Sequence, residues 1–293
     1  MAATCIAEVN VTVTFPSAPI VSAQWLSENH QHVILLDCSV SRSTDANGRT
    51  EFSSGREIFL QQHLPGAQFA DLFGAFSAPH ARFLFTAPDA QRLSAALRSA
   101  GVNQHSLIVA YDQLNGAYAA RIWYLLAGVY GWNNIRVLDG GFASWVQIRG
   151  AIETGPSNPD VRGDVQLKVA RSLLLSTGQV EQETQRPLVC ALRRESFQQA
   201  HISGSINLPY PELLNARGLI DIQRVIAALR DAKLTSPQEL LLYCGGGINA
   251  AGLALALVTA GYPIDSLFLY DDSLNGWLFD NSRPIANDPV IHR

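Results

Sequence analysis

Short apolar runs alternate with amphipathic segments along most of the chain. Four of these runs are typical of strands that are buried on both faces of a sheet. They lie at 33–37, 107–111, 135–138 and 240–243. Apolar residues at helical spacing over 88–100 and 116–129 predict helices between the strands. This alternation predicts an α/β fold in which parallel sheets are flanked by helices.

Two segments near the N-terminus depart from the alternation. Apolar residues at every second position from Val9 to Phe15 indicate an edge strand or an extended arm, to which we assign no function. Residues 39–55 are rich in Ser, Asp, Asn and Gly, and we expect them to form a polar loop.

A stretch of glycines and prolines at 149–166 carries few apolar residues and is predicted to be a linker. We therefore predict an N-terminal domain over 1–150, a linker over 151–166 and a C-terminal domain over 167–293.

The two predicted domains resemble each other in sequence. Three pairs of residues match across 132 positions each, and the constant spacing suggests that no gap separates them. These pairs are Asp112 with Cys244, Asp139 with Asp271, and Trp145 with Trp277. A turn that begins at His63 also matches one that begins at His201. The matches predict two copies of one α/β unit, of which only the second carries a cysteine at this position.

Cys244 is the strongest candidate for chemistry. It ends the apolar run 240–243, and Gly245, Gly246 and Gly247 separate it from a helical pattern that begins near Asn249. Backbone N–H groups of such a loop and the positive end of the helix dipole favour a thiolate over a thiol. The alternative is a cysteine buried in the core. Three successive glycines favour the nucleophile, because a core cysteine needs no such loop.

Composition excludes several classes of function. The chain has 293 residues, 47% of them hydrophobic and 16% charged, with a net charge of −4 and no basic block, so nucleic acid and anionic membranes are not expected partners. We find no apolar run long enough to span a membrane and no secretory signal, and we expect a cytoplasmic protein. The four cysteines show no metal-binding spacing. Six positions after Cys244 stands Ala250, whereas cysteine phosphatases need an arginine there.

The strand, cysteine and glycine loop, the His-x-x-Gly turns and the duplication together resemble the tandem rhodanese-domain sulfurtransferases from about Pro19 onward. The resemblance implies two rhodanese-like domains, the first inactive, and a reaction without cofactor or metal. In it, Cys244 takes a sulfane sulfur as a persulfide and passes it to a thiol or cyanide, with a thioredoxin-like reductant as a possible partner. The alternative is a sulfur-carrier or regulatory binding protein with little turnover.

The loop resembles the 3-mercaptopyruvate branch more than the thiosulfate branch, because positions 245–248 carry no charge. The resemblance implies that Gly245, Gly246, Gly247, Ile248 and Asn249 bind the substrate. That branch usually has serine in place of Gly246 and threonine in place of Asn249. Its serine belongs to a Ser–His–Asp relay, whose histidine would be His63 and whose aspartate has no clear counterpart here.

Other residues keep two interpretations. By resemblance, the substrate carboxylate would be bound by Arg193 or Arg194, which are displaced from the family's arginine position. His63 is either catalytic or a turn residue that fixes its loop by hydrogen bonds. We expect Cys190 to fill a strand end rather than to resolve a disulfide with Cys244. We also expect Arg121 to form an ion pair at the surface or between domains.

Overall fold

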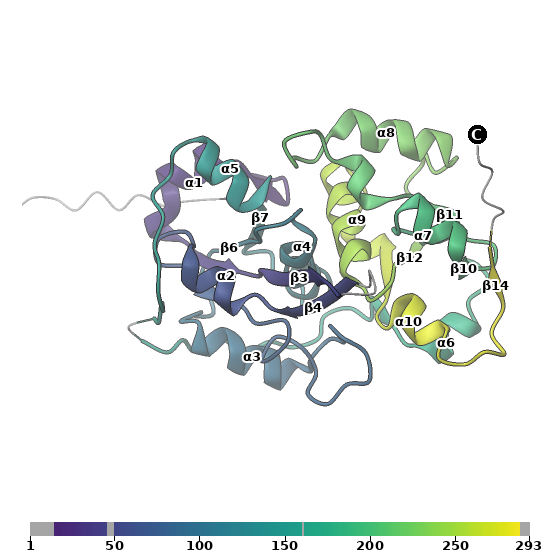
Figure 1. The fold of residues 1–293 in the computed structure, drawn as a ribbon, viewed down its shortest axis with the longest axis horizontal. Coiled ribbons are helices and arrows are strands. Elements are labelled where there is room, and N and C mark those ends of the chain that lie inside the picture. Colours follow the sequence, from purple (N-terminus) through teal and green to yellow (C-terminus); the bar gives the residue numbers. More distant parts are fainter. Residues whose placement is uncertain (1–14, 46–49, 160, 288–293) are drawn as a thin grey trace, which may run out of the picture.

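Two parallel five-stranded sheets organise the computed structural model, which describes residues 15–45, 50–159 and 161–287 (Figure 1). The first sheet has the order β1-β7-β6-β2-β5 and the second the order β11-β9-β12-β13-β8. The first sheet consists of β1 (Ile20–Val21), β2 (Ile34–Asp37), β5 (Gln68–Phe69), β6 (Ile108–Tyr111) and β7 (Ile135–Leu138). The second consists of β8 (Leu174–Leu175), β9 (Leu188–Cys190), β11 (Ile206–Asn207), β12 (Leu240–Tyr243) and β13 (Leu267–Tyr270). The two orders are equivalent, so the predicted α/β fold with two parallel sheets is confirmed.

Helices cover both sheets. Those of the first half are α1 (Ala23–Asn29), α2 (Arg56–Gln61), α3 (Ala90–Ser99), α4 (Ala117–Trp123) and α5 (Gly141–Gln147), with a 3₁₀ turn η1 (His30–His32) and a π-turn η2 (Tyr124–Val129). Those of the second half are α6 (Thr177–Glu181), α7 (Arg194–Gln199), α8 (Ile222–Asp231), α9 (Ile248–Thr259) and α10 (Ser273–Trp277), with 3₁₀ turns η3 (Tyr210–Leu213) and η4 (Ile264–Ser266). None of the helices in the described ranges combines the length and the apolar character that a membrane span requires.

The helices α4 and α9 pack against each other between the two halves (Figure 1). Every residue of α4 is buried, and α9 is buried along most of its length. A helix that is apolar on all sides needs cover on all sides. Its own sheet and the helix of the other half supply that cover, so one hydrophobic core runs through both halves.

Two carboxylates, one from each half, accept equivalent hydrogen bonds from the other half. Asp139 follows β7 and accepts a hydrogen bond from the backbone N–H of Ile220 in the second half, at 3.0 Å. Asp271 follows β13 and accepts one from the N–H of Ala87 in the first half, at 2.9 Å. These residues were matched in sequence, and the structure gives both the same role in holding the halves together.

The constant spacing of 132 positions conceals compensating insertions. The glycine before the helix comes four residues after Asp112 but only three after Cys244, at Gly116 and Gly247. The π-turn η2, with Tyr130 N–H bonded to the carbonyl of Leu125, adds a second residue to the first copy. The second copy has two extra residues at the turn η4, before β13, and these restore the constant spacing. The prediction that the copies align without a gap is therefore wrong, because spacing alone does not detect insertions that cancel.

The polar segment 39–55 is also not a plain loop. It contains an antiparallel hairpin of β3 (Val40–Thr44) and β4 (Thr50–Ser54), which extends from the first half toward the second (Figure 1). Most of its residues are exposed, so the strands lack the apolar alternation that identifies a strand in sequence. The alternating segment predicted at the N-terminus, apart from Phe15, and Cys5 lie outside the described residues.

The segment predicted as a linker follows the surface of the first half. The N–H of Gly155 donates to the carbonyl of Leu60, and the N–H of Gly163 to that of Arg98. Glu153 pairs with His63 as an isolated β-bridge. In the second half, the turn strand β10 (His201–Ile202) pairs in the same manner with the late strand β14 (Ile285–Ala286).

Candidate active site

The Cys244 loop begins at the centre of the second sheet. The strand β12 is fully buried between β9 and β13, and Cys244 follows its last residue at the carboxyl edge. Ligands of open α/β sheets bind at this edge. The loop is fixed from the side of α10, where Ser273 Oγ accepts the N–H of Cys244 at 3.2 Å. Leu274 and Asn275 donate their N–H groups to the carbonyls of Cys244 and Gly245, each at 3.0 Å.

In the first half, the equivalent loop holds an anion of its own. The carboxylate of Asp112 accepts hydrogen bonds from four backbone N–H groups, at 2.8 to 3.1 Å. The donors are Leu114, Gly116, Tyr118 and Ala119. Burial raises the pKa of Asp112, and these four hydrogen bonds oppose the shift. Asp112 thus stands where the second half has Cys244 and bonds the N–H groups of its own loop.

The loop of Cys244 is one residue shorter but ends in the same way. Gly116 and Gly247 both precede a helix in the left-handed region, with φ of 80° and 79°. The helix positions of Tyr118 and Ala119 therefore correspond to Asn249 and Ala250. The first N–H groups of a helix have no partner within the helix and point toward an anion that lies before it. Cys244 thus occupies the place of a carboxylate that is held by four N–H groups.

Cys244 is almost fully buried, and the two glycines that follow it are partly exposed. Cys244 is only 3% exposed, whereas Gly245 and Gly246 beside it are half-buried. A Cβ built on Gly245 would lie 3.9 Å from Leu192 Cδ2. A Cβ on Gly246 would lie 3.5 Å from Asn275 Nδ2, 3.8 Å from the Leu84 carbonyl oxygen and 4.0 Å from Phe85 Cδ2. Sequence reasoning missed these four residues, because they lie on three separate segments that only folding brings to the loop.

His63 is not among the groups that face Gly246. It is 1% exposed, its ring stacks on Phe59 with centroids 4.0 Å apart, and its Nδ1 lies 2.8 Å from the Phe59 carbonyl oxygen. His201 makes the same stack on Phe197 at 3.7 Å and the same 2.8 Å contact. Because each histidine makes this stack and this contact within its own half, both are explained as residues that stabilise their turns. The three atoms nearest to a Cβ at position 246 belong to Asn275, Leu84 and Phe85 and include no imidazole, so the contacts of His63 support its interpretation as a turn residue.

Of the two arginines predicted to bind a substrate carboxylate, Arg194 is paired with a carboxylate at the edge of the second sheet. Arg194 donates to both carboxylate oxygens of Glu212, at 2.7 to 3.0 Å. Both residues line a cavity of about 500 Å³ beside β11, at the outer edge of the second sheet. A cavity of about 340 Å³ beside β5 contains Arg56 at the equivalent place of the first half. Arg193 is exposed and precedes α7. The bidentate partner thus directs Arg194 to the sheet edge and away from the loop.

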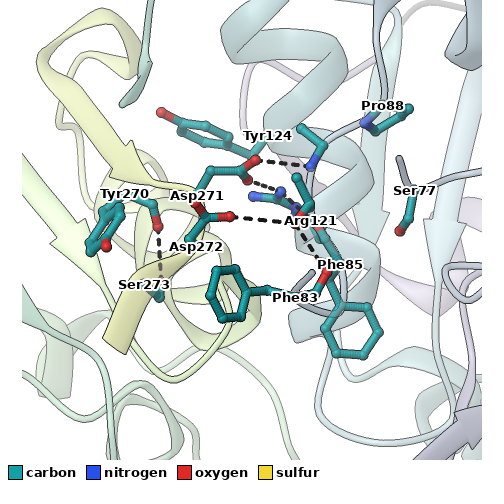
Figure 2. A network of polar contacts seen from close by, with 12 residues as sticks. Ser77, Phe83, Phe85, Pro88, Arg121, Tyr124, Tyr270, Asp271, Asp272 and Ser273 are labelled. Carbon is teal, nitrogen blue, oxygen red and sulfur yellow. Dashed lines mark hydrogen bonds and ion pairs between the residues drawn. The ribbon is translucent and has the colours of Figure 1, made fainter. Parts of the chain in front are cut away.

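A different arginine reaches the loop from the first half. Arg121 is 1% exposed and donates through Nη2 to the Phe85 carbonyl and to the Asp271 carboxylate (Figure 2). This confirms the expected ion pair and places it between the domains. Its Nη1 would lie 3.3 Å from a Cβ on Gly247. Among the described residues, Nη1 and Nε have no hydrogen-bond partner. A buried cation therefore lies directly beneath the start of α9.

Cys190 faces the other side of the sheet. It pairs with Tyr243 in register and belongs to the core cluster of Tyr243, whereas Cys244 belongs to the cluster between the halves. Burial raises its pKa to about 11. The expectation that it fills a strand end is confirmed. The tryptophans Trp123, Trp145 and Trp277 are likewise buried in the core.

Comparison with known proteins identifies the family. The model of the rhodanese-like domain matches residues 22–148 and 180–280. The chain belongs to the rhodanese family. Its two matched segments correspond to the two sheets, so the predicted tandem of rhodanese-like domains is confirmed.

Rhodanese relatives match the chain over most of its length. A Pseudomonas aeruginosa protein named "Probable 3-mercaptopyruvate sulfurtransferase" is 30% identical over 92% of this chain and 98% of its own. The thiosulfate sulfurtransferase of Rattus norvegicus is 26% identical over 88% of this chain and 91% of its own. The crystal structure of SseA from Escherichia coli, a 3-mercaptopyruvate sulfotransferase, shares the fold with a TM-score of 0.76 at 24% identity, covering 88% of this chain and 99% of SseA. The protein is a sulfurtransferase, as the sequence predicted.

Proposed function

We propose that Cys244 accepts a sulfane sulfur as a persulfide and passes it to a thiophilic acceptor. One observation carries this proposal: Cys244 occupies the place of Asp112, whose carboxylate is held by four N–H groups, and both residues precede a helix that begins after a glycine in the left-handed region. An anionic terminal sulfur on Cys244 fits that environment, because such N–H groups stabilise negative charge where it develops. Ile248 and Asn249 supply the first residues of the helix whose dipole supports the same charge.

The preferred donor in this proposal is 3-mercaptopyruvate, with thiosulfate second. The residues from Gly245 to Ile248 carry no charge, and a dianion has no cationic side chain among them. With 3-mercaptopyruvate, the Cys244 thiolate forms a bond to the donor sulfur, and the carbon–sulfur bond breaks. The proton of the donor thiol is transferred to the pyruvate enolate, which leaves as pyruvate, and the persulfide remains as an anion. With thiosulfate, the sulfur–sulfur bond breaks and sulfite leaves with the electron pair.

The acceptor in the second half-reaction is a thiol or cyanide. It attacks the outer sulfur of the persulfide, and the Cys244 thiolate leaves and is regenerated. A thioredoxin-like dithiol would perform the same step and release sulfide while it becomes a disulfide.

Mass spectrometry of the intact protein tests the proposal. After incubation with each donor, the wild type should gain the mass of one sulfur atom, and cyanide should remove it. Cys190→Ala should behave as the wild type, since its thiol faces the opposite side of the sheet. The absence of an adduct with both donors, or an adduct that survives Cys244→Ala, would refute a persulfide at this site.

A sulfur carrier with little turnover is the second candidate. The observation that favours it is that, among the described residues, the three atoms nearest to a Cβ at Gly246 belong to Asn275, Leu84 and Phe85 and include no acid or imidazole. A carrier would load one sulfur per chain and release it slowly. Turnover of about 1 s⁻¹ or faster with either donor would identify an enzyme instead.

A further inference from the structure

Mainly apolar side chains, called the wall below, lie beside the two glycines that follow Cys244. The side chains within 4 Å of a Cβ at Gly245 or Gly246 are those of Leu192, Phe85 and Asn275. Among them only the amide of Asn275 is polar, and none carries a charge. A donor that approaches the thiol past these two half-buried glycines therefore contacts hydrocarbon on two sides.

The wall residue Phe85 is held in an unfavourable conformation. Its φ is 67°, in the left-handed region that bulky residues avoid. Its ring packs edge-on against Phe73 and Tyr118, with centroids 5.2 and 5.8 Å apart. Outliers of this kind persist only where the surroundings enforce them, and they concentrate at ligand sites.

Contacts from both halves hold this conformation, Arg121 from the first half and Asp271 from the second. Arg121 Nη2 donates to the Phe85 carbonyl at 2.9 Å, and two residues later the N–H of Ala87 donates to Asp271 at 2.9 Å (Figure 2). The same segment is closed on itself by the N–H of Ala78, which donates to the carbonyl of Thr86 at 2.8 Å. The position of the Phe85 ring over the loop is thus fixed by contacts on both sides of it.

We propose that Phe85 is a specificity-determining residue, which makes the Cys244 site select organic sulfur donors with an apolar group beside the transferred sulfur over inorganic thiosulfate. An organic thiosulfonate represents this class. This inference rests on the proposed function and names its substrate class.

The chemistry of such a donor matches the site. The Cys244 thiolate attacks the outer sulfur, a sulfur–sulfur bond to Cys244 forms, and the donor's own sulfur–sulfur bond breaks. The sulfinate leaves with the electron pair, so no proton is needed from the wall. Tyr118 packs against the Phe85 ring. Burial raises the pKa of Tyr118, as do the nearby charges of Asp112 and Cys244, so its hydroxyl remains neutral. The apolar group of the donor contacts the Phe85 ring, and the Asn275 amide can donate to a sulfonyl oxygen.

The test compares two donors on one protein. The ratio of kcat/KM for benzenethiosulfonate to that for thiosulfate is measured in the wild type, in Phe85→Ala and in Phe83→Ala. Phe83 is a matched control, because its ring lies against Phe279, with centroids 6.1 Å apart, and not against the loop. Because both donors are assayed on the same preparation, the ratio does not depend on the fraction of the variant that folds.

The wild type should prefer the organic donor, and Phe85→Ala should lower the ratio about tenfold, as expected when an aromatic contact is lost. Phe83→Ala should keep the wild-type ratio. A ratio below one in the wild type, or an unchanged ratio in Phe85→Ala, would overturn this inference while leaving the persulfide at Cys244 intact. Failure of both donors to add sulfur to Cys244 would instead overturn the proposed function on which it rests.

Discussion

Replacing Gly247 by alanine should disable the Cys244 loop while the rest of the fold remains. Gly247 has a φ of 79°, and a Cβ there would lie 3.0 Å from the Asp271 carbonyl oxygen and 3.3 Å from Arg121 Nη1. A side chain in the left-handed region costs roughly 1–2 kcal/mol. The close approach to a backbone carbonyl adds about 1 kcal/mol or more, because that carbonyl cannot retreat without moving the interdomain ion pair.

Gly116→Ala is the matched control in the inactive half. Gly116 has the same place before its helix and a φ of 80°, but the nearest atom to its Cβ would be Tyr210 Oη at 3.4 Å. Gly116→Ala should therefore lower the free energy of unfolding only by the cost of the left-handed backbone conformation, roughly 1–2 kcal/mol. Urea unfolding of both variants measures this difference in the free energy of unfolding.

The activity of the two variants should differ more than their stability. A shift of a few tenths of an ångström in Gly247 moves the N–H groups around Cys244, and we expect about a tenfold loss in kcat. Gly116→Ala should stay within about twofold of the wild type, because Asp112 takes no part in transfer. Equal stability and equal turnover in the two variants would refute the view that close packing beneath Gly247 shapes the loop.

Three further changes test other parts of the site. Arg121→Met leaves the Asp271 carboxylate, which is 15% exposed, without its cation, so unfolding should become easier by about 3 kcal/mol, and combining it with Asp271→Asn should recover part of that loss in urea melts. His63→Ala and His201→Ala should each lower stability by about 1–2 kcal/mol and leave kcat nearly unchanged, since both rings stack on a phenylalanine and contact its carbonyl oxygen, although His63 Nε2 also lies 3.8 Å from the exposed Glu153 carboxylate; a loss of kcat confined to His63→Ala would restore its catalytic role. Because burial raises the pKa of Cys190 to about 11, this group remains a thiol below that pH, and peptide mapping after alkylation of the native protein at pH 8 should find it unmodified.

The sequence alone determined the α/β architecture, its duplication and the place of the candidate nucleophile. These features are local: apolar runs such as 240–243 identify buried strands, and three glycines after a strand-end cysteine identify a loop that a helix follows. The match of Asp139 with Asp271 even identified a pair of residues with equivalent contacts between the halves. The exposed hairpin 40–54 was missed, because its strands bury too little to leave an apolar pattern.

Only the tertiary structure decided what surrounds Cys244. The packing of α4 against α9 brings Arg121 beneath Gly247 and sets Phe85 over Gly246, although these residues are more than a hundred positions from the cysteine in sequence. The same packing leaves His63 in its own turn, while Glu212 directs Arg194 to the edge of the sheet. Sequence patterns report which residues are buried and in which local element. Contacts between two halves depend on how their surfaces fit, and that fit is fixed only when both have folded.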